Sequence, residues 1–228
     1  RDWSSDVCSS DLLEKVRTQM PDSILITGDL IDQRKYNLHQ AMIFVRGAVK
    51  IAPVYYVSGN HEAWSGHYET IENSLIEAGV IVLDNSEIDV IKGVDTIKIM
   101  GVSDPDFLTS NYFEGTDASL LEKTLNEWSF DENGSFRILL SHRPELFDVY
   151  QGANIDLVFS GHAHGGQIRL PFVGGLVAPD QGFLPKYTSG SYTEGSTTMY
   201  VSRGLGNSIV PQRLFNRPEI VVVTLRSK

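Results

Sequence analysis

The stretch that decides the fold reads Ser160-Gly161-His162-Ala163-His164-Gly165-Gly166-Gln167 and directly follows an apolar run at residues 155–159. The apolar run is typical of a buried strand, and two residues separated by one point to the same face of extended backbone. Neutral imidazole is the commonest metal ligand in proteins. Glycines on both sides let the backbone turn sharply and come close to a bound group. A lone His-x-His also occurs in structural roles, so a metal site is indicated only if the ends of other predicted strands carry ligand residues as well.

Polar side chains follow three further apolar segments in the same way. Gly-Asp and Gly-Asn are ordinary turn dipeptides on their own, but four such turns at strand ends indicate one site. Because ligands bind at the carboxyl ends of parallel strands, we expect the turns to converge, and their oxygen and nitrogen atoms suit Mn, Fe or Zn. The turns carry Asp29 and Asp32 after residues 23–27, Asn60, His61 and Glu62 after residues 53–57, His142 after residues 136–140, and His162 and His164 after residues 155–159.

The composition is ordinary for one globular α/β domain with a sizeable core. The chain has 228 residues, of which 41% are hydrophobic and 21% charged. The formal net charge of -10 argues against a dedicated DNA or RNA surface, which needs a basic footprint. No apolar run reaches the length of about 18 residues that can span a membrane.

Residues 1–12 differ from the rest of the chain. They form a Ser- and Asp-rich string without hydrophobic period, which resembles one reading frame of a sequencing adapter. We interpret them as a non-native artefact or tag, and we expect an N-terminally truncated domain over residues 13–228. Cys8 is the only cysteine and lies in this string, so neither a disulfide nor a thiolate metal site is expected in the domain.

Hydrophobic periodicity predicts several further elements. Two β runs at residues 88–91 and 96–102 have no helix between them, which favours an antiparallel pair. Residues 220–225 are apolar enough to close the chain as a strand. The Gly- and Pro-rich stretch at residues 174–195 is too long for a simple connector and is a candidate active-site loop. Helices are expected at residues 13–20, 37–50, 68–78 and 118–128.

Taken together, these motifs resemble the calcineurin-like metallophosphoesterases. The resemblance rests on Gly-Asp-x-x-Asp, Gly-Asn-His-Glu, the Ser-His turn and Gly-His-x-His. The longer forms Ser-His-Arg-Pro-Glu at residues 141–145 and Gly-His-Ala-His-Gly-Gly-Gln at residues 161–167 look like the bacterial phosphodiesterase branch. The resemblance covers residues 13–228 and implies an α/β fold of two packed mixed β-sheets flanked by helices, here without the first strand.

The resemblance also implies a centre of two divalent metal ions. In it, Asp29 bridges both ions, Asn60, His142 and His162 complete one site, and His164 belongs to the other. The family pattern adds an Asp-x-His before Gly-Asp-x-x-Asp, and this sequence has none. One site is therefore expected to be incomplete. We expect this chain to hold about one ion tightly and to turn over slowly, and a parent protein with the Asp-x-His strand to hold two.

Other residues receive supporting roles by the same resemblance. His61 is predicted to be the catalytic group that protonates or stabilises the leaving oxygen, and not a metal ligand. Glu62 and Asp32 are interpreted as groups that orient the ligands, although Asp32 fits a solvated turn residue equally well. Contacts to the rest of the substrate are predicted for Arg143, Arg169, Lys186 and Arg203.

The implied activity is hydrolysis of a phosphoric ester, preferably a diester. Two interpretations stay open beside it: an impaired phosphoesterase fold that serves as an interaction module, and a phosphomonoesterase or protein phosphatase. The substrate is expected to be a small or lipid-linked phosphoester. The full-length bacterial parent is expected at the membrane or cell envelope.

Overall fold

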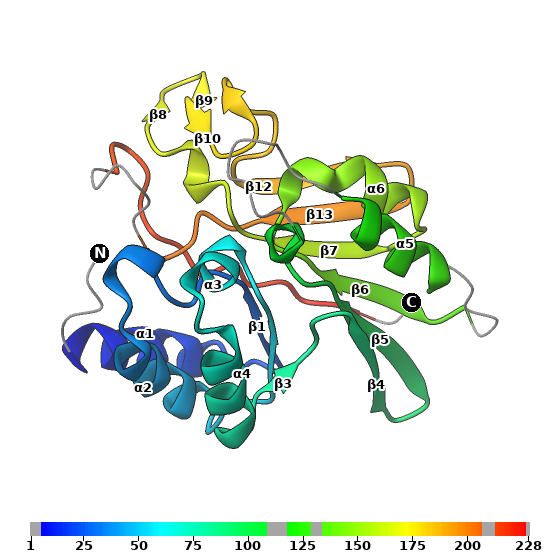
Figure 1. Cartoon of the computed structure of the whole chain (residues 1–228). Helices are drawn as coiled ribbons and strands as arrows, with labels where there is room; N and C mark the ends of the chain where they lie inside the picture. Colours follow the sequence, from blue (N-terminus) through cyan, green and yellow to red (C-terminus); the bar gives the residue numbers. More distant parts are fainter. Residues whose placement is uncertain (1–5, 109–117, 129–133, 207–212, 227–228) are drawn as a thin grey trace.

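Two β-sheets lie face to face between helices in the computed structural model, which describes residues 6–108, 118–128, 134–206 and 213–226 (Figure 1). In these residues the first sheet has the order β1-β2-β3 and is parallel, and the second has the order β12-β13-β7-β6-β5-β4 and is mixed. This confirms the expected α/β class. The strands are β1 (Ile24–Thr27), β2 (Val54–Val57), β3 (Ile81–Val82), β4 (Ser86–Lys92), β5 (Asp95–Gly101), β6 (Phe136–Leu140), β7 (Leu157–Ser160), β12 (Gly190–Glu194) and β13 (Thr197–Val201).

Helices cover the outer face of each sheet. The first sheet carries α1 (Asp6–Thr18), α2 (Leu38–Ala48) and α4 (Tyr68–Glu77), and the second carries α5 (Ser119–Glu127) and α6 (Phe147–Gly152) (Figure 1). In the described part of the chain, no helix is both long and apolar enough to cross a membrane. Shorter elements are α3 (Asn60–Ser65) and the 3-10 turns η1 (Gln33–Lys35), η2 (Pro105–Phe107), η3 (Pro144–Leu146) and η4 (His164–Gly166).

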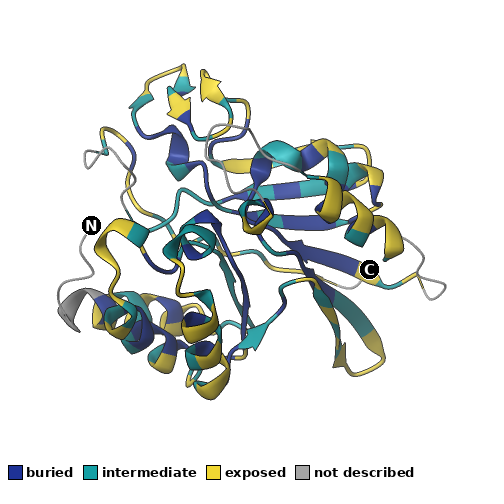
Figure 2. Cartoon of the chain, viewed as in Figure 1, coloured by how far each residue is buried: buried dark blue, intermediate teal, exposed yellow. Residues whose placement is uncertain are grey.

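The two-residue alternation of the strands separates three apolar clusters. In β2, Tyr55 and Val57 face the second sheet, whereas Val54 and Tyr56 face the helices of the first sheet. Successive side chains of a strand point to opposite faces, so one strand serves both layers of the core. Figure 2 shows β2 in dark blue, the colour of buried residues. The sheets are therefore held rigidly against each other, and their strand ends with them.

The stretch expected as an active-site loop, residues 174–195, begins within two small hairpins and ends in β12. The hairpins rise above the sheets in Figure 1. Their strands are β8 (Arg169–Leu170), β9 (Gly174–Gly175), β10 (Val177–Ala178) and β11 (Gly182–Phe183). Because η4 leads almost directly into β8, the hairpins stay connected to the His-x-His turn.

The first helix begins earlier than the sequence pattern indicates. The expected helix spans residues 13–20, whereas α1 runs from Asp6 to Thr18. Leu12 and Leu13 pack against the cluster that α2 shares with the first sheet. Residues 6–12 therefore extend the expected helix toward the N-terminus. That residues 1–12 are a non-native tag stays a prediction.

The closing strand expected at residues 220–225 is not formed. Val223 packs against the cluster between the sheets, but Ile220 and Val222 are exposed. Within the described residues this segment lies in no strand ladder. A strand exists only where a neighbour accepts and donates its backbone hydrogen bonds, and periodicity alone cannot supply that neighbour.

Leu139→Ala is expected to lower the free energy of unfolding by about 2–5 kcal/mol, since it leaves a cavity in a closed core. Leu139 lies in β6, is fully buried and packs among the side chains under α5 and α6. The measurement is urea unfolding. Val94→Ala, in the exposed turn between β4 and β5, serves as the control and should change stability by about 0.5 kcal/mol or less. Equal losses in both variants would contradict this placement of the core.

Candidate metal centre

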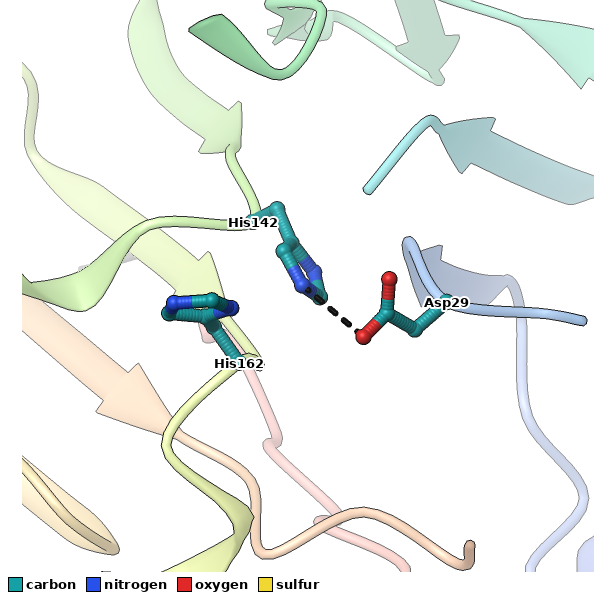
Figure 3. Close-up of side chains that lie close together, drawn as sticks. All are labelled: Asp29, His142 and His162. Atoms are coloured by element: carbon teal, nitrogen blue, oxygen red, sulfur yellow. Dashed lines mark ion pairs between the residues drawn. The ribbon is translucent and has the colours of Figure 1, made fainter. Parts of the chain in front are cut away.

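The polar turns after β1, β2, β6 and β7 meet at one edge of the two sheets. Figure 3 shows the side chains of Asp29, His142 and His162 close together, on three different segments, with His142 facing Asp29. One potential ligand atom from each lies within 4.8 Å of the others. Asn60, the first residue of α3, completes the group from the end of β2. The structure thus brings together four residues whose convergence the sequence predicts.

The spacing of these atoms fits a single shared ion. Asn60 Oδ1 lies 3.0 Å from His142 Nε2 and 3.0 Å from His162 Nδ1. His142 Nε2 lies 3.3 Å from Asp29 Oδ2. Two atoms that bind one ion at about 2.1 Å are separated by roughly 3.0–3.4 Å at octahedral or tetrahedral angles. These three separations are therefore the ones that ligands of a common ion require.

The tautomer of His142 gives an independent test of that fit. Its Nδ1 lies 2.6 Å from the carbonyl oxygen of Thr27, which can only accept, so Nδ1 carries the ring proton. In the neutral ring Nε2 then presents a lone pair to Asn60 Oδ1 and the Asp29 carboxylate. Lone pairs that face one another in a buried site need a cation between them. The donor set and its orientation thus fit a divalent metal.

Backbone conformation brings these ligands close together. Asp29 and His162 both adopt left-handed backbone, with φ of 53° and 59°. For most residues other than glycine this conformation costs about 1 kcal/mol or more, and such strain gathers at functional sites. Gly59 lets two turns touch, since a Cβ there would lie 2.5 Å from Asp29 Oδ1 and 2.7 Å from Asp29 N.

Electrostatics keep the Asp29 carboxylate charged. Burial by itself raises the pKa of Asp29, but His142, His61 and His162 together lower it well below its usual range. Burial lowers the pKa of His142, and the charge of Asp29 outweighs this effect and raises it to about 9. The two groups therefore attract each other strongly, and a metal ion would take the place of the proton between them.

Glu62 ties the first two turns together. Its buried carboxylate accepts N–H groups from Asp29 and Gly59 at 2.8 Å each and from Ile31 at 3.1 Å. Burial and the charge of Asp29 raise the pKa of Glu62 to about 7. Asp32 is instead half-exposed and accepts from Arg34 N at the start of η1. Glu62 thus has the contacts of an orienting group, and Asp32 those of a turn residue.

His61 and His164 stand beside this group in different ways. The Nδ1 atom of His61 accepts the N–H of Gln33 at 3.2 Å, so Nε2 carries the proton of the neutral ring and lies 3.9 Å from Asp29 Oδ2. Burial lowers the pKa of His164 to about 3, which keeps its imidazole neutral. Among the described residues, His164 Nδ1 is buried without a hydrogen-bond partner. A buried neutral imidazole with an unused nitrogen suits a metal ligand.

Comparison with known proteins identifies the family. The sequence pattern of the calcineurin-like phosphoesterases matches residues 8–166. The chain belongs to the calcineurin-like phosphoesterases. The metallophosphoesterase YkuE of Bacillus subtilis is 35% identical over 216 residues, which are 93% of this chain and 70% of YkuE. The phosphodiesterase YaeI of Escherichia coli is 28% identical, over 95% of this chain and 74% of YaeI. The protein is therefore a phosphoric ester hydrolase that uses divalent metal.

Solved structures share the fold of this calcineurin-like phosphoesterase. TT1561 of Thermus thermophilus has a TM-score of 0.54 at 15% identity, over 86% of this chain and 82% of TT1561. The phosphopantetheinyl hydrolase PptH of Mycobacterium tuberculosis has a TM-score of 0.52 at 12% identity, over 82% of both chains. At such low identity these two likenesses concern the fold alone.

Arg143 of the phosphoesterase is buried among carboxylates, and its predicted contact with a substrate stays a prediction. Its side chain is 1% exposed, and it donates to Asp104 at 2.7 and 2.8 Å and pairs with Asp106 at 2.7 Å. An arginine enclosed by carboxylates has its donors already engaged. The other three substrate contacts stay predictions: Arg169 donates to Gly165 O at 2.9 Å, Lys186 pairs with Glu194 at 3.0 Å, and Arg203 pairs with Glu219 at 3.3 Å.

Two residues of the site were not identified from the sequence. Asp180, in the turn between β10 and β11, places Oδ2 2.9 Å from His162 Nε2. Asn216 donates to the carbonyl oxygens of His164 and Gln167 at 2.6 and 3.0 Å and thereby holds the His-x-His turn. The long stretch at residues 174–195 already indicated a functional loop, but no local pattern singled out Asp180 within it.

Gly59→Ala is expected to weaken metal binding about 10-fold or more and to lower the free energy of unfolding by about 1–3 kcal/mol, because the added Cβ displaces the Asp29 backbone. Gly152→Ala is the control, since a Cβ there meets no atom within 4 Å. Chelator competition and urea unfolding measure the two effects. Wild-type metal affinity in the Gly59 variant would show that the two turns do not depend on this contact.

Proposed function

We propose that the protein hydrolyses phosphodiesters at a metal centre held by Asp29, Asn60, His142, His162 and His164. The observation that carries the proposal is the set of lone-pair atoms about 3 Å apart at the sheet edge. The name of the relative YaeI, a phosphodiesterase, supports the choice of a diester over a monoester. We also propose that one ion is held tightly by four side chains and a second more weakly by Asp29 and His164.

Divalent ions bound at such a centre polarise the phosphoryl oxygen and make water a competent nucleophile at neutral pH. The protein contributes the fixed orientation of the ligands. Thr27 O sets the tautomer of His142, and Glu62 holds the turns of Asp29 and Gly59 against each other. Because these partners are backbone groups and a buried carboxylate, little reorganisation is needed when an ion binds.

We propose that His61 stabilises the leaving group. Gln33 N–H occupies Nδ1, which leaves the protonated Nε2 on the side of Asp29 and the centre. The Asp32 carboxylate lies 3.7 Å from the same Nδ1 atom. Trp64 contacts the imidazole, with ring centroids 5.8 Å apart, and limits its rotation. His61 can therefore donate a hydrogen bond from Nε2 to the departing oxygen and stabilise its developing charge.

The test compares bis(4-nitrophenyl) phosphate with 4-nitrophenyl phosphate in the presence of Mn²⁺. Faster hydrolysis of the diester supports the proposal. Preference for the monoester would instead support a phosphomonoesterase or protein phosphatase. Metal binding without hydrolysis of either compound would support an interaction module. Metal analysis after gel filtration gives the stoichiometry, for which we expect about one tightly held ion per chain.

A further inference from the structure

Asp180 is the one acidic side chain of the hairpins that contacts a proposed metal ligand among the described residues. Its Oδ2 lies 2.9 Å from His162 Nε2. A carboxylate can only accept, so Nε2 carries the ring proton and Nδ1 presents its lone pair. That lone pair faces Asn60 Oδ1, 3.0 Å away, on the side where the ion would bind. The tautomer that His162 needs as a ligand is thus the one that Asp180 selects.

Arg143 holds Asp180 in this place. Asp104, whose side chain is fully buried, accepts two hydrogen bonds from the guanidinium at 2.7 and 2.8 Å. The remaining Nη1 atom donates to Asp180 Oδ2. Two-point contact between planar groups fixes orientation as well as distance. Asp180 is therefore held by Arg143, which is itself fixed in the core, although the turn that carries Asp180 is partly exposed.

The same atoms do not form a second metal site. Ligand atoms of Glu145, His162 and Asp180 do lie close enough together to surround an ion. The Nη1 atom of Arg143 stands among them, however, 3.6 Å from Glu145 Oε1 and 3.2 Å from His162 Nε2. The guanidinium already supplies the positive charge that the carboxylates of Glu145 and Asp180 require. What Asp180 does for a metal ion must then act through His162.

We propose that Asp180 is a positioning residue that fixes the tautomer and orientation of His162 and so couples the β10–β11 hairpin to the metal centre. The inference rests on the proposed function, because it requires an ion on the Nδ1 side of His162. A carboxylate on the outer nitrogen of a metal-bound histidine raises the basicity of the ring and locks its orientation. Loss of such a partner typically costs about 10–100-fold in metal affinity.

The experiment measures Co²⁺ affinity by chelator competition, together with the visible spectrum of the Co²⁺ protein, for Asp180→Asn and two controls. Asp106→Asn removes a carboxylate from the same guanidinium, and that carboxylate is paired with Arg143 at 2.7 Å. Glu194→Gln removes a negative charge at the end of the same loop, where it pairs with Lys186. The controls separate contact with His162 from loss of charge and from loss of an Arg143 partner.

We expect Asp180→Asn to weaken Co²⁺ binding about 10–100-fold and to shift the spectrum, with both controls within about threefold of the wild type. Asp180→Glu keeps a carboxylate and should recover most of the affinity, which a general loss of packing would not allow. Equal weakening in Asp180→Asn and Asp106→Asn would overturn the positioning role, as would wild-type affinity and spectrum in Asp180→Asn. A wild-type protein that binds no Co²⁺ would instead refute the proposed metal centre.

Discussion

Asp29→Asn is expected to abolish tight metal binding and to lower the rate of diester hydrolysis by about 10³-fold or more, because loss of a single electrostatic contact already costs about 10²–10³-fold. Asp29 supplies the only carboxylate of the proposed four-ligand site, and its Oδ2 faces His142 at 3.3 Å. Its Oδ1 also accepts the N–H of His61 at 3.0 Å and so positions that residue. The substitution removes charge and changes shape very little.

The fold should survive this change. The left-handed backbone of Asp29 suits asparagine as well as aspartate. The measurements are metal content after gel filtration, hydrolysis of bis(4-nitrophenyl) phosphate, and thermal unfolding of the metal-free protein. Asp22→Asn is the matched control, since Asp22 is an exposed carboxylate paired only with the exposed Lys92 at 3.0 Å among the described groups. Full metal content in the Asp29 variant would contradict the proposed centre.

His61→Ala is expected to lower turnover by about 10²–10⁴-fold while metal content stays that of the wild type. The imidazole contacts Gln33 N through Nδ1 and stands 3.9 Å from Asp29, which places it beside the ligands and not among them. Aryl diesters with a good leaving group need less help from an acid. The loss should therefore grow as the pKa of the leaving phenol rises.

His67→Ala is the control for this second prediction. His67 lies on the exposed surface just after α3, where its ring contacts Tyr36 at a centroid distance of 4.8 Å. It should leave both turnover and metal content unchanged. If His61→Ala lost its metal, His61 would be a ligand, and if it kept full turnover, the acid role would be excluded.

The site shows how far local information reaches. Asp29, Asn60, His142 and His162 were predictable because each directly follows an apolar strand, and parallel neighbours bring strand ends to one edge. Arg143 follows a strand as well, and its charge suggested a substrate contact. Its actual partners come from two segments that are distant in sequence: Asp104 and Asp106 at η2, and Asp180 in the turn between β10 and β11. Burial of a charge depends on what surrounds it, and no local pattern reports that.

The sequence by itself determined the family, the sheet-and-helix order and the convergence of the strand-end residues, since periodicity and turn composition are local properties of the chain. Only the tertiary structure decided three further features. Residues 6–12 join α1 because Leu12 finds an apolar surface, and residues 220–225 form no strand because no neighbour pairs with them in the described part. Asp180 contacts His162, 18 residues earlier in the chain, because Arg143 donates a hydrogen bond to the Asp180 carboxylate and is itself held by Asp104. Each of these features depends on contacts between segments that are distant in sequence. Such contacts form only in the folded chain, so no local pattern predicts them.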